Sequence, residues 1–167
     1  MPREGEPAYE EARAVGRALA RRRARVVCGG YAGVMEAACR GASEEGGESL
    51  GVILAGRGEP NAFVTSTVEA RDLAERLTRL RDPSHGWIFL PHGLGTMLEL
   101  VWFAESIVKR EVVARPLVLL GDFWRPTLDT ALREATGSGA AELAACVRYA
   151  NSPEEAASLA CGEGGGA

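Results

Sequence analysis

Two glycine-rich segments are the residues of this sequence whose types and spacing most clearly suggest chemistry. Gly29-Gly30-Tyr31-Ala32-Gly33 follows the predicted strand 25–28, and Pro91-His92-Gly93-Leu94-Gly95-Thr96 follows the apolar run 87–90. A helical spacing of apolar residues comes after each segment, so both predict the order strand, glycine loop, helix. The first N–H groups of a helix have no partner within the helix, and the helix dipole makes this end partly positive. Both segments therefore predict a phosphate-binding loop, in which glycine lets the backbone approach the anion closely.

Ligands of open α/β sheets bind at the carboxyl ends of the strands, so two such loops at neighbouring strands would face one ligand. Thr96 would add a hydroxyl donor, and His92 is either a packed side chain or a further phosphate donor. Glycine also serves turn geometry alone, so a purely structural role of both loops remains an alternative. Neither loop has the Gly-Lys-Ser/Thr of a P-loop or a complete G-x-G-x-x-G fingerprint, which argues against an ATPase and an NAD enzyme.

Arg76 and Glu99 are the charged side chains that the order of elements places nearest to the second loop. Glu99 follows one turn into the helix, where it is either a site residue or a carboxylate that complements the helix dipole. Arg76 is either a site residue or a surface arginine paired with Glu75 or Asp72. Spacing alone leaves both alternatives open.

Three segments together resemble the LOG family of nucleoside 5′-monophosphate phosphoribohydrolases, over roughly residues 8–120. Pro91-x-Gly93-x-Gly95-Thr96-x-x-Glu99 is similar to the P-G-G-x-G-T-x-x-E motif of that family. The segment 29–37, with Met35, is similar to the first glycine motif of its bacterial branch, G-G-x-x-G-x-M-E-A. Glu75-Arg76 stands where the family has E-R-K; Leu77 replaces the lysine of that segment, and His92 replaces the second glycine of the long motif.

The resemblance implies hydrolysis of the N-glycosidic bond of an AMP-like nucleotide, without a cofactor, by a homodimer or higher homo-oligomer. Arg76 and Glu99 would then be catalytic, and the nucleotide would bind at Gly29, Gly30, Gly33 and Met35 and at the loop Pro91-His92-Gly93-Leu94-Gly95-Thr96. A related branch of the same fold carries the molybdenum cofactor or binds nucleotides without cleaving them, which is the alternative function. A lysine decarboxylase is excluded, because the only lysine, Lys109, lies at the far end of the helix from the phosphate loop.

The elements that must position these residues alternate in the way typical of a Rossmann-like α/β fold: a three-layer sandwich with a mainly parallel sheet and helices on both faces. One domain over residues 1–161 and a flexible tail at 162–167 are expected, with no strand before residue 8. The segment 55–67 is predicted to be a long loop that borders the site. The helix after the second glycine loop is apolar all round, which indicates a homodimer interface. Helices are predicted at 8–22, 34–45, 70–81, from the second loop to about 110, and at 127–135 and 153–160, and strands at 25–28, 50–54, 87–90, 117–120 and 146–149.

Composition restricts the classes of partner. The net charge is −4 and the basic residues are mostly dispersed, which disfavours nucleic-acid binding. No apolar run is long enough to cross a membrane and the amino terminus has no secretory signal, so a cytoplasmic protein is expected. Cys28, Cys39, Cys146 and Cys161 form no C-x-x-C pair, so we expect buried, inert thiols and no metal site.

Overall fold

The computed structural model describes residues 1–91, 93–134 and 136–162, and its contacts divide the chain into two compact units. The N-terminal unit comprises residues 1–84, and the C-terminal unit comprises the described residues from 85 onward. The single domain expected over residues 1–161 stays a prediction. His92 and residues 163–167 of the predicted tail lie outside the described residues.

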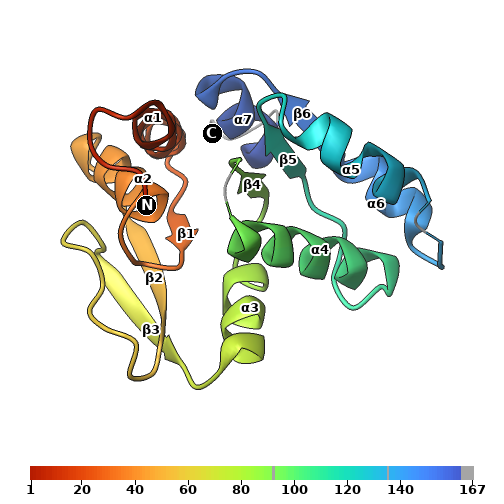
Figure 1. The fold of residues 1–167 in the computed structure, drawn as a ribbon, viewed down its shortest axis with the longest axis horizontal. Helices are drawn as coiled ribbons and strands as arrows, with labels where there is room; N and C mark the ends of the chain where they lie inside the picture. Colours follow the sequence, from red (N-terminus) through yellow and green to blue (C-terminus); the bar gives the residue numbers. More distant parts are fainter. Residues whose placement is uncertain (92, 135, 163–167) are drawn as a thin grey trace. The chain divides into compact units, whose positions relative to one another are not determined.

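The N-terminal unit is built on a three-stranded parallel sheet with the order β1-β2-β3 (Figure 1). No strand precedes β1 in the described residues, as predicted. Helices α1 and α2 pack on each other, and α3 packs against β2 and β3. The elements are α1 (Pro7–Arg21), β1 (Val26–Cys28), α2 (Val34–Glu44), β2 (Ser49–Leu54), β3 (Ser66–Ala70) and α3 (Leu73–Arg81).

The C-terminal unit has a second three-stranded parallel sheet, with the order β4-β5-β6. Trp87 and Phe89 contact Phe103 of α4, whereas Gly86 packs against Ala160 of α7. Since successive strand residues point to opposite faces, α4 and α7 cover opposite faces of the sheet, and β5 is buried throughout. The elements are β4 (Trp87–Phe89), α4 (Leu94–Val108), β5 (Leu117–Leu120), α5 (Trp124–Arg133), α6 (Ala140–Cys146), β6 (Val147–Ala150) and α7 (Pro153–Cys161). These parallel sheets with packed helices confirm the Rossmann-like α/β class.

Strand β3 was not predicted, and its discovery corrects two boundaries. The predicted loop 55–67 ends before Ser66, and Ala70, predicted as the start of a helix, is the last residue of β3. The strand is polar at alternate positions because it is the edge of the sheet, so its composition resembles that of a loop. Helix α3 begins at Leu73 because the Asp72 carboxylate accepts a hydrogen bond of 2.9 Å from the N–H of Glu75.

One boundary and one helix of the C-terminal unit also differ from the prediction. Helix α5 begins at Trp124 rather than at 127, because the indole is fully buried and donates a 2.9 Å hydrogen bond to the carbonyl of Phe89. Helix α6 was not predicted, because it is short and rich in alanine.

Helices α1 and α2 meet backbone to backbone. A Cβ added to Gly41 of α2 would lie 1.9 Å from the carbonyl oxygen of Arg13, and one added to Gly16 of α1 would lie 2.0 Å from that of Ala38. Only glycine at these two positions allows so close an approach. The pair therefore fixes how α2, and the glycine loop at its start, is seated in the N-terminal unit.

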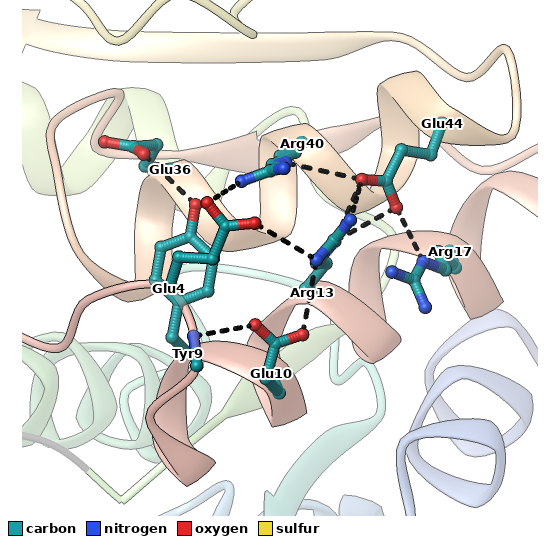
Figure 2. Close-up of polar contacts among 9 residues, drawn as sticks. Glu4, Tyr9, Glu10, Arg13, Arg17, Glu36, Arg40 and Glu44 are labelled. Carbon is teal, nitrogen blue, oxygen red and sulfur yellow. Dashed lines mark hydrogen bonds and ion pairs between the residues drawn. The ribbon is translucent and has the colours of Figure 1, made fainter.

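An ion-pair network covers the same helix pair (Figure 2). Glu44 of α2 accepts hydrogen bonds from Arg13 Nε (2.9 Å) and Arg17 Nε (2.7 Å) of α1. Arg40 Nη1 lies 2.8 Å from Glu4 Oε2, which ties the N-terminal segment to α2. Glu44 is thus the carboxylate on which two arginines of the other helix converge.

The network predicts a loss of stability in acid. The hydrogen bond from Arg13 is the main cause that lowers the pKa of Glu44 from 4.5 to about 2. A carboxyl group whose pKa is lower in the folded state stabilises the protein above its unfolded pKa, and this contribution is lost as the pH falls from 4.5 towards 2. In urea unfolding at about pH 6 and about pH 3, Glu44→Gln should therefore lose less stability than the wild type between the two conditions. An equal loss in both proteins would contradict the assignment.

Candidate phosphate-binding site

The second glycine loop joins β4 to α4. Gly93 is the N-cap of that helix, with φ of 22°, and as a glycine it has no side chain of its own to cap the helix. The first turn of α4 contains no acidic residue, and Gly93 and Gly95 are exposed. The N–H groups at this end have no partner within the helix, so a partly positive surface of accessible donors is present.

Packing does not explain the glycine at position 95. Apart from its two chain neighbours and the nearby backbone of its own helix, no described atom lies within 4 Å of a Cβ added to Gly95, and its φ is not positive. A glycine inside a helix costs about 1 kcal/mol relative to alanine. A glycine that weakens its own helix and is required by no neighbour leaves open space beside the start of α4, where an anion could approach.

Pro91 and Leu94 have different positions around this loop. Pro91 is partly buried and faces Gly121, which follows β5, since a Cβ on Gly121 would lie 3.6 Å from Pro91 Cγ. The Leu94 side chain is 90% exposed, so only its backbone N–H belongs to the amide cradle.

The first glycine loop differs from the second in two ways: the fold requires its glycines, and the first turn of the helix that follows contains a carboxylate. Gly33, the N-cap of α2, has φ of 76°, and a Cβ on Gly30 would lie 3.0 Å from Cα of Gly51 in β2. The fold itself thus requires these glycines. The first turn of α2 already contains Glu36, which accepts a 3.1 Å hydrogen bond from the Tyr9 hydroxyl. Because this carboxylate already complements the dipole of α2, the amino end of α4 is the better anion site.

Arg76 of α3 extends to the carboxyl ends of β1 and β2. Its Nε donates a 2.9 Å hydrogen bond to the carbonyl of Val52, and its guanidinium lies 5.8 Å from the centre of the Tyr31 ring. A Cβ on Gly29 would lie 1.9 Å from Arg76 Nη2 and 2.7 Å from Met35 Sδ, so both side chains pack on this glycine. Three predicted site residues, Gly29, Met35 and Arg76, are therefore brought together in the N-terminal unit.

The neighbours of Arg76 explain two features of the sequence. Glu75 forms the surface ion pairs of α3, with Arg71 and Arg79 at 2.7 Å each. Leu77, which stands in place of the lysine of E-R-K, is 2% exposed and belongs to the core. The replacement of lysine by leucine thus serves packing at this position.

Glu99 is partly buried and lies beyond the first turn of α4. The first turn itself contains no acidic residue. The favourable effect of a carboxylate on the helix dipole falls off within that turn, so the dipole accounts for little of its position. Glu99, Thr96 and the loop of Gly93 belong to the C-terminal unit, and Arg76 belongs to the N-terminal unit.

Sequence reasoning missed Asn61 and Tyr31. The side-chain amide of Asn61 donates to the carbonyls of Gly30 (3.0 Å) and Tyr31 (3.1 Å), and its backbone N–H also donates to Gly30 (2.8 Å). The Tyr31 hydroxyl accepts a 2.8 Å hydrogen bond from the N–H of Leu54. These contacts place Asn61, in the loop after β2, beside the first glycine segment. No sequence signal singles out Asn61, whereas Tyr31 lies within the glycine segment itself.

Other candidate sites are absent from the described part of the chain or lie elsewhere. A shallow apolar hollow of about 380 Å³ lies beside α3, and none of the predicted site residues lines it. Residues 1–91, 93–134 and 136–162 contain no group of three metal-ligating side chains and no helix with the length and apolar character needed to span a membrane.

Comparison with known proteins identifies the family. Parallel strands that lead through glycine loops into helices define a Rossmann-like α/β protein. The chain belongs to the SLOG cluster 4 family, whose model matches residues 2–156. This match confirms the LOG-like resemblance. A search of curated proteins found no significant relative.

Several solved structures share the fold. The molybdenum cofactor carrier protein from Chlamydomonas reinhardtii is 24% identical over 90% of this chain and 83% of its own, with a TM-score of 0.71. The molybdenum cofactor binding protein from Rippkaea orientalis is 21% identical over 93% of this chain and 87% of its own, with a TM-score of 0.70. The protein TM1055 is 20% identical over 93% of this chain and 90% of its own, with a TM-score of 0.66.

Proposed function

We propose that the protein binds the phosphate group of a small phosphorylated molecule at the amino end of α4 and acts as a carrier of that molecule. The observation that carries the proposal is the open space around Gly95, at the start of a helix whose N-cap is a glycine and whose first turn contains no carboxylate. Phosphate contacts there would come from the backbone N–H groups of Gly93, Leu94 and Gly95, and from the N–H and hydroxyl groups of Thr96.

The cargo we propose is a nucleotide or a phosphorylated pterin such as the molybdenum cofactor. Two solved structures of the same fold are described as a carrier and a binding protein of that cofactor, which supports this class of cargo. Leu77 stands in place of the lysine of E-R-K and lies in the core. Arg76 is therefore the cation of this segment that reaches the ends of β1 and β2. We also propose that Arg76, with Gly29, Gly30, Gly33 and Met35, forms a cargo-binding surface of the N-terminal unit.

A second candidate function is hydrolysis of a nucleoside 5′-monophosphate. Its support is Glu99, which lies beyond the first turn of α4, within the LOG-like motif. Cleavage of the bond between base and ribose develops positive charge on the sugar, which a nearby carboxylate would stabilise.

Binding and turnover of AMP by purified protein distinguish the two functions. We expect saturable binding without release of adenine, and an affinity that Arg76→Gln lowers about tenfold because a charged donor is lost. Arg79→Gln, on the same helix but paired with Glu75, is the matched control and should bind like the wild type. Adenine release that Glu99→Gln abolishes would favour the hydrolase, and an unchanged affinity of Arg76→Gln would contradict the role of that arginine.

We further propose that α4 forms a homo-oligomer interface. Leu100, Phe103 and Ile107 are buried, but Val101 and Trp102 on the other side of α4 are 52% and 37% exposed. Val101→Glu should lower the molar mass in light scattering, because a charge in an apolar interface is unfavourable. Val113→Glu, at an exposed residue outside α4, should leave the mass unchanged. The same mass for the wild type and Val101→Glu would contradict the interface.

A further inference from the structure

Two cysteines that the sequence suggested to be inert lie in contact. Cys28 is the last residue of β1 and is partly exposed, and Cys39 of α2 is fully buried. Their Sγ atoms are 3.5 Å apart, although eleven positions separate the two residues. The other two cysteines, Cys146 and Cys161, lie in the C-terminal unit.

We propose that Cys28 and Cys39 form a reversible disulfide when the protein meets a two-electron oxidant of the peroxide class. One thiolate attacks an oxygen of the peroxide, the O–O bond breaks, and the thiol becomes a sulfenic acid as the first water leaves. The second sulfur then attacks the sulfenic sulfur, the S–S bond forms, and hydroxide leaves and takes up a proton to become the second water. Two thiols thus lose two electrons and two protons, and one peroxide becomes two waters.

The two thiols shift each other's pKa values in opposite directions. The hydrogen bond from Cys28 lowers the pKa of Cys39, with Ser49 and Asn61 contributing in the same direction. The same bond to Cys39, together with burial, raises the pKa of Cys28. Because the thiolate is the reactive species and Cys39 is fully buried, the short distance between the sulfurs, rather than their ionisation, favours the disulfide.

A disulfide here would alter the first glycine loop. The sulfurs must approach from 3.5 Å to about 2.05 Å, and Cys28 directly precedes Gly29, on which Arg76 packs. The N–H of Gly30 also donates a 3.4 Å hydrogen bond to Cys28 Sγ. Oxidation would therefore move the loop and the arginine that we assign to the cargo. This consequence rests on the proposed function, whereas the disulfide itself does not.

Mass spectrometry tests the disulfide without any ligand. Cleavage after Arg25 and Arg40 releases both cysteines in one peptide, 26–40, while Cys146 and Cys161 fall in other peptides. After hydrogen peroxide and alkylation of the full chain, we expect peptide 26–40 to lose two hydrogen atoms and to carry no alkyl group. The number of alkylated cysteines should fall from four to two, and dithiothreitol should restore it.

The variants make the result specific. Cys28→Ser and Cys39→Ser should each prevent the loss of two hydrogen atoms, whereas Cys146→Ser, remote from the pair in sequence, should retain it. Complete alkylation of both cysteines in peptide 26–40 after peroxide would overturn the proposal. Oxidation of Cys28 to sulfinic acid without a cross-link would overturn it equally. Since no phosphorylated molecule is present, failure here leaves the proposed cargo binding unaffected.

Discussion

Replacing Gly95 by alanine should stabilise the free protein and weaken phosphate binding at the same time. Alanine at a helical position with open space should raise the free energy of unfolding by about 1 kcal/mol. The same methyl group would occupy the space in which an anion approaches the amides. Gly95→Asp should lower the affinity for AMP about 100-fold, because like charges at close range are unfavourable by several kcal/mol.

Urea unfolding and calorimetric titration measure the two effects separately. Val113→Asp introduces the same charge at a residue that is 77% exposed and outside α4, so it should bind AMP like the wild type. If Gly95→Asp also bound like the wild type, the anion site would not be at the start of α4. If Gly95→Ala lost stability, the glycine would have a structural role after all.

Gly41→Ala should have the largest effect on stability. Its Cβ would lie 1.9 Å from the carbonyl oxygen of Arg13, a backbone atom that cannot move without separating α1 from α2. Overpacking of this kind destabilises proteins by about 3 kcal/mol, and the gain in helix propensity offsets only a part of it. Chemical denaturation measures the change in the free energy of unfolding.

The matched control for Gly41→Ala is Gly95→Ala, which makes the same replacement within a helix where no described atom is near. The two variants should therefore change stability in opposite directions. A Gly41→Ala variant as stable as the wild type would show that the two helices do not meet at this glycine.

Local patterns predicted most of the fold. Apolar periodicity placed α1, α2, β2, β5 and α7 within a residue or so, because each buries a regular face. The edge strand β3 was missed, since one side of it is polar and its residues resemble a loop. The backbone contact at Gly41 could not be predicted, because it depends on residues far apart in the chain.

In the candidate site, too, local features were predictable from the sequence and contacts between distant residues were not. The glycine segments were visible as strand, loop and helix, and this order depends only on neighbouring residues. The packing of Arg76 on Gly29, the hydrogen bonds of Asn61 to the first loop and the contact between Cys28 and Cys39 join residues distant in sequence. The sequence also could not distinguish glycines that the fold requires, such as Gly30, from Gly95, which it does not.

An amide chemical-shift titration tests most directly whether the start of α4 holds a phosphate. Isotope-labelled protein would be titrated with AMP, with inorganic phosphate as the competitor. We predict saturable shifts of the N–H resonances of Gly93, Gly95 and Thr96, which phosphate reverses. Saturable binding of AMP that leaves these three resonances unmoved would contradict the account.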